Sequence, residues 1–265
     1  MKIPFVKLHG AGNDFLLTDT ASAPSTDLDS IAIAICNRYT GVGGDGWMLV
    51  DRTGGPNYHA SIRLFNSDGS EPELSGNGTR CAAALLAREK PDQREFNIRT
   101  GAGIKHLRLI AGDGHSFEFE MNMGQIRVTE LQATVQGRDA VVVDCGNPQC
   151  ALPVDSFDFD WRALGALIER DSRFPKRTNV SFLRRIDPHT LDVRFWERGA
   201  GETNSSGTGS TGAAMAAIAR GIVVSPVTIR TAAGPLLLRT ENGVYLTGPA
   251  EFVADGMFSY VKMAS

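Results

Sequence analysis

The chain has 265 residues, 42% of them hydrophobic, and a formal net charge of −3. This length suits two domains of roughly 130 residues, each large enough to bury its own core. The small negative charge and the scattered Lys and Arg residues argue against a nucleic-acid partner. The first residues, MKIPFVKLHGAGNDF, contain neither a signal-peptide core nor a membrane-spanning run, so we expect a cytoplasmic protein without a membrane partner.

Strands are expected over most of the chain, because many segments alternate apolar and polar residues. In chain order these segments are residues 15–17, 47–50, 62–65, 96–99, 104–110, 117–121, 140–144, 180–184, 191–196, 227–230, 236–239, 244–247 and 256–265. Apolar residues at helical spacing predict helices over 28–38 and 161–170, with Asp27 and Asp160 as N-caps. Two Ala-rich segments, 77–89 and 208–220, predict helices whose small side chains suit tight burial.

One segment of the sequence occurs twice. Residues 63–83 read RLFNSDGSEPELSGNGTRCAA and residues 194–214 read RFWERGAGETNSSGTGSTGAA, with Arg, Glu, Ser, Gly and Ala recurring 131 residues apart. The repeat predicts an α+β fold of two pseudo-symmetric lobes, each a strand-rich sheet or barrel wrapped around a central helix. We expect residues 1–120, with the C-terminal strand 256–265, to form the N-terminal lobe and residues 121–255 to form the C-terminal lobe.

Each copy of the repeat places a serine, Ser75 or Ser206, directly before Gly-x-Gly and a predicted helix. The free N–H groups and the dipole of a helix N-terminus bind anions. A single copy is also typical of ordinary N-capping, but two equivalent copies favour a ligand. If both helices face one cleft, a single carboxylate can be held by backbone N–H groups from both lobes, those of Gly76, Asn77, Gly207 and Thr208.

Metal and nucleotide chemistry find no support in the sequence. No group of His, Cys, Asp and Glu has metal-ligand spacing, and neither Gly-rich loop matches a phosphate-binding or dinucleotide motif. The cysteines Cys36, Cys81, Cys145 and Cys150 lack C-x-x-C spacing, which indicates reduced thiols. We therefore expect no metal and no cofactor.

Seven motifs in the chain resemble those of the diaminopimelate epimerase family, the amino-acid racemases that work without pyridoxal phosphate. They are HGAGNDF at 9–15, TGVGGDG at 40–46, FNSDGSE at 65–71, SGNGTRC at 75–81, GNPQC at 146–150, RFPKRTN at 173–179 and ERGAGETNSSGTGS at 197–210. They follow the family order and span nearly the whole chain. The resemblance implies an isomerase that inverts an amino acid, in lysine and cell-wall precursor biosynthesis, and it makes a homodimer possible.

The resemblance also implies roles for individual residues. In the family, cysteines at the positions of Ser75 and Ser206 exchange a proton with opposite faces of the α-carbon. The helix N-termini that follow them hold the α-carboxylate. The amino groups and the distal end of the substrate are bound by residues matching Asn13, Asn66, Asn147, Asn179, Glu197 and Arg198, and all six are present here.

The departures from the family fall on the proton-transfer groups. Serine stands at both cysteine positions, and Gln149 replaces a histidine that lies near the first of them. A thiol has a pKa near 8.5, whereas an alcohol ionises roughly 7 units higher, which adds on the order of 10 kcal/mol to forming the base. A direct exchange of serine for thiolate therefore predicts a large loss of racemisation.

Four interpretations remain open. The chain is a family member with engineered Cys→Ser changes, a divergent isomerase that uses Glu197 as its base on another amino-acid-like substrate, or an inactive amino-acid-binding homologue. A serine hydrolase is a fourth possibility, in which His9 is the only histidine placed to reach a catalytic serine. We favour a cofactor-independent epimerase that binds a small amino acid, with Ser75, Ser206 and Glu197 as catalytic residues.

Overall fold

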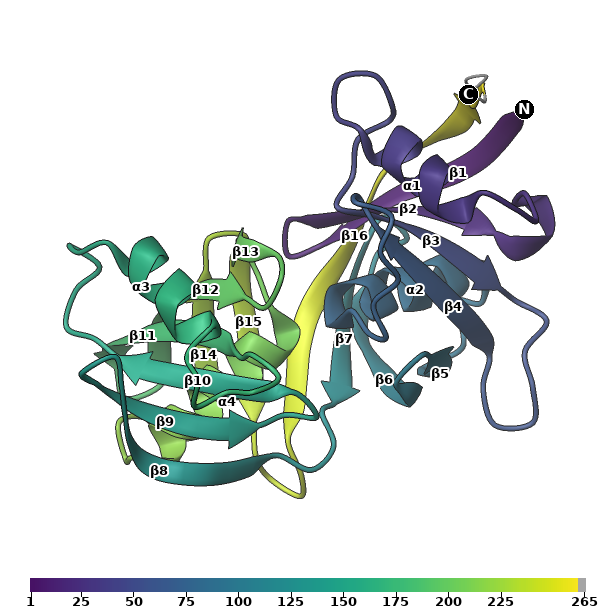
Figure 1. Cartoon of the computed structure of the whole chain (residues 1–265). Helices are drawn as coiled ribbons and strands as arrows, with labels where there is room; N and C mark the ends of the chain where they lie inside the picture. Colours follow the sequence, from purple (N-terminus) through teal and green to yellow (C-terminus); the bar gives the residue numbers. More distant parts are fainter. Residues whose placement is uncertain (262–265) are drawn as a thin grey trace. The chain divides into compact units, whose positions relative to one another are not determined.

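The computed structural model describes residues 1–261, which form sixteen β-strands and four α-helices (Figure 1). The chain divides into two compact units. Unit 1 contains Met1–Met121 and the segment from Gly248 onward, and unit 2 contains Asn122–Thr247. No helix among the described residues is long and apolar enough to cross a bilayer.

The last strand, β16 (Tyr245–Ser259), belongs to both units. Its first three residues pair with β15 of unit 2, and Glu251 to Ser259 pair with β1 of unit 1. The division at Gly248 therefore falls inside one continuous strand, eight residues before the boundary expected from the sequence. Of the expected strand 256–265, residues 262–265 lie outside the described part of the chain.

Unit 1 is an eight-stranded barrel around one helix. In sheet order its strands are β1 (Lys2–Gly10), β2 (Asn13–Asp19), β3 (Gly46–Asp51), β4 (Ala60–Asn66), β5 (Glu95–Thr100), β6 (Gly103–Gly112) and β7 (Ser116–Asn122), and β16 pairs with both β7 and β1. Helix α2 (Gly76–Glu89) packs against β1, β2, β4, β5 and β6, and most of its residues are buried. The small Ala side chains allow this close enclosure.

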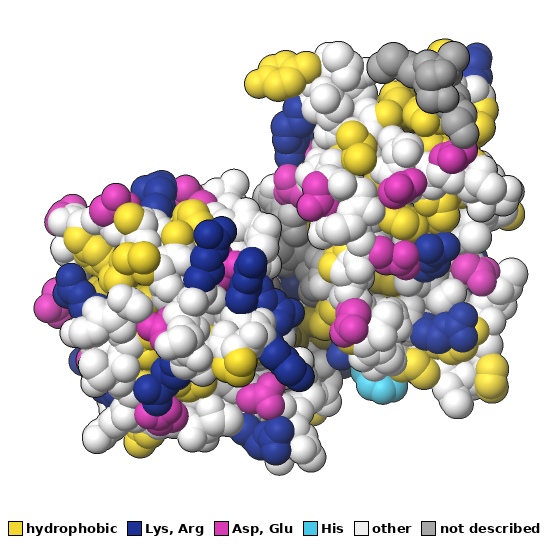
Figure 2. All heavy atoms as spheres, viewed as in Figure 1, with side chains coloured by type: hydrophobic (Ala, Val, Ile, Leu, Met, Phe, Trp, Pro, Cys, Tyr) yellow, Lys and Arg dark blue, Asp and Glu magenta, His cyan; other side chains and the backbone are white. Residues whose placement is uncertain are grey.

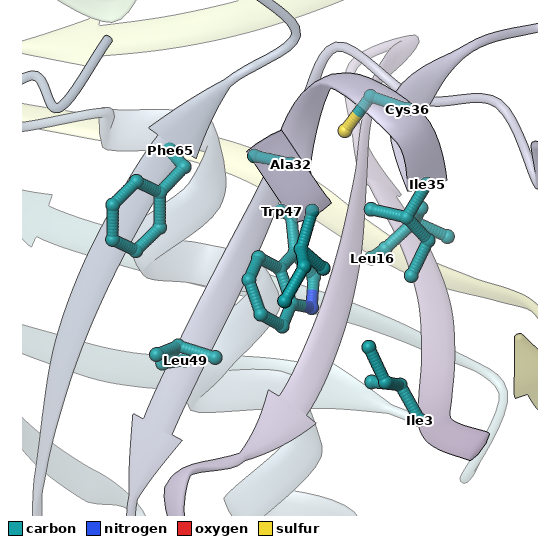
Figure 3. Packing of buried hydrophobic residues seen from close by; sticks show 9 residues of the cluster. Ile3, Leu16, Ala32, Ile35, Cys36, Trp47, Leu49 and Phe65 are labelled. Atoms are coloured by element: carbon teal, nitrogen blue, oxygen red, sulfur yellow. The ribbon is translucent and has the colours of Figure 1, made fainter. Parts of the chain in front are cut away.

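A second helix covers the other face of β3 and β4. Neighbouring strand residues point to opposite faces, so Met48 lies close to Gly78 of α2 while Trp47 packs under α1 (Leu28–Cys36). Figure 3 shows Trp47 between Ile35, Leu16 and Phe65. The indole Nε1 donates to Thr18 Oγ1 at 2.9 Å, which satisfies the only polar atom of this large buried side chain.

Unit 2 repeats the strand order of unit 1. Its sheet runs β8 (Arg127–Val135), β9 (Arg138–Asp144), β10 (Pro148–Pro153), β11 (Asn179–Asp187), β12 (Thr190–Glu197), β14 (Val227–Thr231), β15 (Gly234–Arg239) and β16, and β13 (Gly201–Thr203) pairs with β12. From β9 to β15 the pairs alternate between antiparallel and parallel, and β15 pairs with β16 antiparallel. The pairs from β1 to β7 follow the same sequence of directions. Helix α4 (Gly207–Ala219) packs against seven of these strands. The predicted duplicated α+β fold is confirmed.

The two outer helices begin differently. Asp160 caps α3 (Trp161–Glu169) as predicted, because its carboxylate accepts a hydrogen bond from the Ala163 N–H at 3.0 Å. The prediction for α1 is wrong. Asp27 has a left-handed φ of 59°, and its side chain makes no capping hydrogen bond to the helix. A residue that leaves the extended region at the N-cap no longer aims its carboxylate at the free N–H groups.

On the face seen in Figure 2, acidic and basic side chains are interspersed. Ion pairs join neighbouring segments of the chain, such as Arg63 with Glu71 in unit 1 and Arg162 with Glu202 in unit 2. At least one partner of each pair is more than half exposed, so each contributes little to stability.

Candidate active site

The two repeat serines are N-caps of the two enclosed helices. Ser75 has φ −129° and ψ 119°, and Ser206 has φ −140° and ψ 122°. Each hydroxyl oxygen accepts a hydrogen bond at 3.1 Å from the N–H three residues later, in Gly78 or Gly209. This matched geometry leaves the remaining N–H groups of each first turn free for an anion.

The loops before both serines are held by the same contacts. The Ala102 N–H donates to the Glu73 carbonyl at 3.1 Å, and the Ala233 N–H donates to the Asn204 carbonyl at 3.2 Å. Both donors lie in a β-turn that joins two antiparallel strands, β5 to β6 in unit 1 and β14 to β15 in unit 2. The duplication therefore preserves the backbone that positions each serine.

Ser206 has a carboxylate partner within unit 2. Its hydroxyl donates to Glu197 Oε2 at 2.8 Å, and Thr203 Oγ1 donates to Glu197 Oε1 at 2.7 Å. Burial raises the pKa of the Glu197 carboxyl above its usual range, more than these two hydrogen bonds lower it. Glu197 is thus a stronger base than an exposed glutamate.

Ser75 has no such partner in unit 1. The residue equivalent to Glu197 is Asn66, at the end of β4, and its amide donates to Ser70 Oγ at 2.9 Å. Among the described residues, no acceptor is recorded for the Ser75 hydroxyl. The two units therefore share the same backbone around the serine but differ in the side chain beside it, which is Glu197 in unit 2 and Asn66 in unit 1.

The other predicted residues of unit 2 meet at the ends of adjacent strands. Asn179 begins β11 opposite Gln149 of β10, and its Oδ1 accepts from the Arg198 N–H at 2.9 Å. The Asn147 amide lies 3.4 Å from Thr208 Oγ1 at the start of α4. Parallel pairing of β10 with β11 thus brings Asn147, Asn179 and Arg198 to the edge where α4 begins.

Gln149 is buried beside these residues. Its Nε2 donates to Asn147 Oδ1 at 2.6 Å, and its side chain packs against Gly212 of α4. Its Oε1 has no hydrogen-bond partner among residues 1–261. Gln149 therefore supports Asn147, and unlike an imidazole it has no titratable group to offer.

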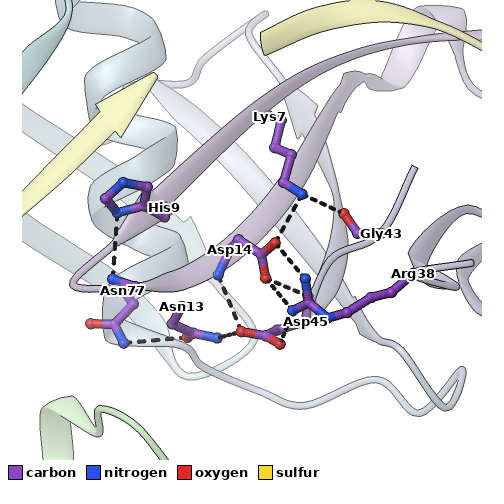
Figure 4. A network of polar contacts seen from close by, with 9 residues as sticks. Lys7, His9, Asn13, Asp14, Arg38, Gly43, Asp45 and Asn77 are labelled. Atoms are coloured by element: carbon purple, nitrogen blue, oxygen red, sulfur yellow. Dashed lines mark hydrogen bonds and ion pairs between the residues drawn. The ribbon is translucent and has the colours of Figure 1, made fainter. Parts of the chain in front are cut away.

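In unit 1, two loops and helix α2 are joined by a polar network (Figure 4). The Asn77 amide lies 3.3 Å from Asn13 Oδ1, and the Asn13 amide donates to Asp45 Oδ2 at 2.6 Å. Asn66 lies on the neighbouring strand, paired with Gly46. The predicted residues Asn13, Asn66 and Asn77 are thus on connected elements at one end of the barrel.

The structure reveals supporting residues that the sequence did not identify. Arg38 donates to Asp14 at 2.7 Å and to Asp45 at 2.8 Å, and Lys7 lies 3.0 Å from Asp14. Although burial alone raises it, hydrogen bonds from Arg38 and Lys7 hold the pKa of the Asp14 carboxyl at about 2. This ionic cluster fixes the two loops that carry Asn13 and Asp45.

Glu169 has a matching structural role in unit 2. This buried carboxylate accepts from the Trp196 indole at 3.1 Å and from the Gly199 N–H at 3.0 Å. These two partners, Trp196 and Gly199, directly precede and follow Glu197 and Arg198 in the sequence. The sequence gives one sign of this role: Glu169 is an acidic residue on an otherwise apolar helix face.

His9, the histidine considered for a serine hydrolase, is occupied elsewhere. Its Nδ1 accepts from the Gly12 N–H at 3.4 Å, and its Nε2 lies 3.9 Å from Glu251. Within the described residues no hydrogen bond joins His9 to Ser75. The geometry of unit 1 therefore does not assemble a Ser-His pair.

Thiol reagents are expected to leave activity unchanged. Cys36, Cys81, Cys145 and Cys150 are all buried, and burial raises the pKa of each thiol to about 12. Neutral, inaccessible thiols react slowly. Activity and intact mass measured after iodoacetamide treatment test this, with unfolded protein as the positive control for labelling. Loss of activity together with labelling of one native cysteine would contradict it.

Comparisons with known proteins identify relatives of this chain. The family profile described as diaminopimelate epimerase matches residues 5–129 and 141–253. The diaminopimelate epimerase of Pelotomaculum thermopropionicum is 34% identical over 278 residues, covering 97% of this chain and 99% of that protein. The diaminopimelate epimerase of Moorella thermoacetica is 37% identical over 279 residues, covering 96% and 98%.

Solved structures share the fold. A hydroxyproline epimerase from Agrobacterium vitis superimposes with a TM-score of 0.75 at 14% identity, covering 97% of this chain and 92% of that one. A predicted epimerase from Pseudomonas aeruginosa gives 0.73 at 18% identity, covering 96% and 98%. At these identities the structural likeness concerns the fold alone.

Proposed function

Because this chain belongs to the diaminopimelate epimerase family and is a cofactor-independent isomerase of the epimerase class, we propose that it interconverts the LL and meso forms of diaminopimelate in lysine biosynthesis. The amino acid is the one partner that the proposal requires. Homodimer formation and a cytoplasmic location stay predictions from the sequence.

The hydrogen bond between Ser206 and Glu197 carries the proposal. A serine hydroxyl alone is a poor base, but Ser206 Oγ donates its proton to Glu197 Oε2 at an oxygen–oxygen distance of 2.8 Å, and the pKa of the Glu197 carboxyl is raised. As Ser206 Oγ takes the α-proton, its own proton passes to Glu197 Oε2. The breaking C–H bond leaves its electron pair on the α-carbon, delocalised into the substrate carboxylate, so no free alkoxide forms.

Ser75 completes inversion in the proposal by acting on the opposite face of the α-carbon. Its O–H donates the proton that forms the new C–H bond, and the oxygen regains a proton from water. The hydroxide left behind takes the proton held by Glu197, so both groups return to their starting states. The Gly78 N–H bonded to Ser75 Oγ stabilises the negative charge that develops there.

In the reverse direction the same steps run backwards. Glu197 first takes a proton from water, and the hydroxide formed accepts the Ser75 proton as Ser75 Oγ takes the α-proton. Ser206 donates to the opposite face as Glu197 returns a proton to its oxygen.

Recognition is assigned to the remaining polar groups. The Arg198 side chain is exposed and donates one recorded hydrogen bond, from Nη1 to the Lys176 carbonyl at 3.1 Å. Its other donors can hold the distal carboxylate, as a guanidinium does in a two-bond contact. The amides of Asn13, Asn66, Asn147 and Asn179 are assigned to the amino groups and the distal end of the substrate.

Chiral chromatography after incubation with LL-diaminopimelate tests the proposal. We expect the meso form to appear and the mixture to approach equilibrium from either stereoisomer. Calorimetry on the same samples separates the alternatives. Binding without interconversion would support the inactive homologue, and neither binding nor interconversion would point to another amino-acid-like substrate.

A further inference from the structure

Four polar side chains of unit 1 form one continuous series of hydrogen bonds. The Arg80 Nη2 donates to Asn77 Oδ1, and the Asn77 Nδ2 donates to Asn13 Oδ1 at 3.3 Å. The Asn13 Nδ2 in turn donates to Asp45 Oδ2 at 2.6 Å. Figure 4 shows the links from Asn77 to Asp45. Every bond runs in the same direction, from Arg80 to Asp45, and we call this series the amide relay.

The first member of the amide relay can only donate. Arg80 is 0% exposed, and burial lowers the pKa of its guanidinium to about 10, so it is protonated at neutral pH and offers no acceptor. Its Nε donates to the Pro249 carbonyl at 3.1 Å, which holds the side chain in place. A neutral amide in this position could turn and accept, whereas a guanidinium cannot. Asn77 must therefore face Arg80 with its oxygen.

The last member of the amide relay can only accept. Asp45 forms a salt bridge with Arg38 at 2.8 Å, so its side chain is a carboxylate. Its Oδ2 also accepts from the Asp14 N–H at 3.2 Å. An ionised carboxylate has no proton to donate. Asn13 must therefore face Asp45 with its nitrogen and Asn77 with its oxygen.

The two ends impose one consistent orientation on both amides. A side-chain amide keeps nearly the same shape when it turns by 180°, so only its hydrogen-bond partners distinguish the two orientations. A turned Asn77 would place its N–H groups against those of Arg80, and a turned Asn13 would place its oxygen against the Asp45 carboxylate. Such mismatches are costly in a buried network, and Asn77 is only 2% exposed.

The matched helix of unit 2 has no amide relay. The residue equivalent to Asn77 is Thr208, and the residue equivalent to Arg80 is Thr211, whose hydroxyl donates to the Gly207 carbonyl. A hydroxyl rotates to suit its partners and imposes no orientation on an amide. The duplicated fold therefore does not require a buried arginine at this place.

We propose that Arg80 and Asp45 are positioning residues that fix which end of the Asn13 amide is the donor and which is the acceptor. The inference rests on the proposed function, in which Asn13 binds the substrate. Beyond the relay, the Asn13 nitrogen keeps one further N–H and its oxygen keeps one further lone pair. The relay holds this donor and this acceptor in fixed places, so the site favours a ligand whose groups match that order. Neither Arg80 nor Asp45 touches the substrate in this proposal.

Asn77→Asp and Asp45→Ala, alone and together, test the amide relay in the protein without ligand. The new carboxylate at position 77 can only accept, so it and Asp45 both require an N–H from the single amide of Asn13. Asp45→Ala removes one of these acceptors and lets the Asn13 amide turn. We expect Asn77→Asp to change the melting temperature more favourably, by about 2 to 4 °C, in the Asp45→Ala background than in the wild type. Equal changes in the two backgrounds would overturn the proposal.

The same substitutions in an Asn13→Ala protein are the control. Direct repulsion between carboxylates at positions 45 and 77 does not need Asn13, whereas the amide relay acts only through it. We expect the difference between the two backgrounds to disappear without Asn13, and a difference of unchanged size would also overturn the proposal. Asn57→Asp adds the same charge at an exposed position of unit 1, and its effect should not depend on Asp45.

Binding of LL-diaminopimelate, measured by calorimetry, tests the positioning role, also if Asn13→Ala fails to fold. In the Asn77→Asp/Asp45→Ala protein the Asn13 amide is turned, so its donor and acceptor have exchanged places. We expect its affinity to fall about tenfold or more below that of Asp45→Ala, although the melting temperature rises. A purely structural role predicts that affinity and melting temperature rise together, and that result would refute the proposal. A wild type that binds no diaminopimelate would contradict the proposed function, whereas the melting temperatures decide the relay without a ligand.

Discussion

Replacing Ser75 and Ser206 together by cysteine is expected to raise the rate of α-proton exchange by about 10²-fold or more. Both positions cap a helix whose free N–H groups stabilise a thiolate, and a thiol ionises roughly 7 pKa units more easily than an alcohol. The backbone around both serines already has matched geometry. Exchange of the α-proton of diaminopimelate, followed by mass spectrometry in heavy water, measures the gain.

The single variants give the control for this prediction. Ser75→Cys alone and Ser206→Cys alone should each gain much less, because inversion needs a proton acceptor on one face and a donor on the other. Adding Gln149→His to the double variant should raise the rate further, since it introduces a titratable ring. A double variant that folds, binds diaminopimelate and exchanges no faster than the wild type would limit the family relationship to fold and binding.

Glu197→Gln is expected to lower the exchange rate by about 10²- to 10⁴-fold, the range for loss of a positioned general base. The amide still hydrogen-bonds Ser206 and Thr203, but it cannot accept the serine proton. The control is Glu202→Gln, in the next strand, where the wild-type carboxylate pairs with Arg162. This substitution is expected to leave the exchange rate unchanged. Equal rates for Glu197→Gln and the wild type would remove Glu197 from the mechanism.

The same substitution should have a pH-dependent effect on stability. Burial raises the pKa of Glu197 in the folded protein, so the folded state binds its proton more tightly than the unfolded chain. The wild type then loses stability as the pH rises from about 4.3, the ordinary glutamate value, through the raised pKa. We expect Glu197→Gln to be at least as stable as the wild type at pH 8, with the difference shrinking toward pH 4. Denaturant titrations at both pH values measure it.

Much of the fold could be predicted because the sequence repeats. The two Ala-rich segments of the repeat predicted both enclosed helices to within one residue of their observed starts, at Gly76 and Gly207. Four strands were not predicted: β1, β8, β10 and β13. β8 exposes most of its residues, and β10 is only six residues long with a proline at each end. Their strand conformation depends on pairing with β9, which local sequence does not encode.

The candidate site was predictable only where local motifs mark it. The serines, the asparagines, Glu197 and Arg198 all lie in the sequence motifs, at strand ends and in the turns beside them. The supporting ion pairs could not be predicted from local sequence. Arg38 and Asp14 are 24 residues apart and meet only when β2 and β3 pair.

Deuterium incorporation from heavy water tests the central claim most directly, because it reports the breaking of the α-carbon C–H bond whatever the stereochemical outcome. The account predicts that diaminopimelate incubated with the wild-type protein gains deuterium at the α-carbon above the buffer control. The Glu197→Gln protein should reduce that incorporation toward the control. Diaminopimelate that binds the wild-type protein, as shown by calorimetry, and gains no deuterium at any pH between 6 and 9 would contradict proton transfer by Ser206 and Glu197.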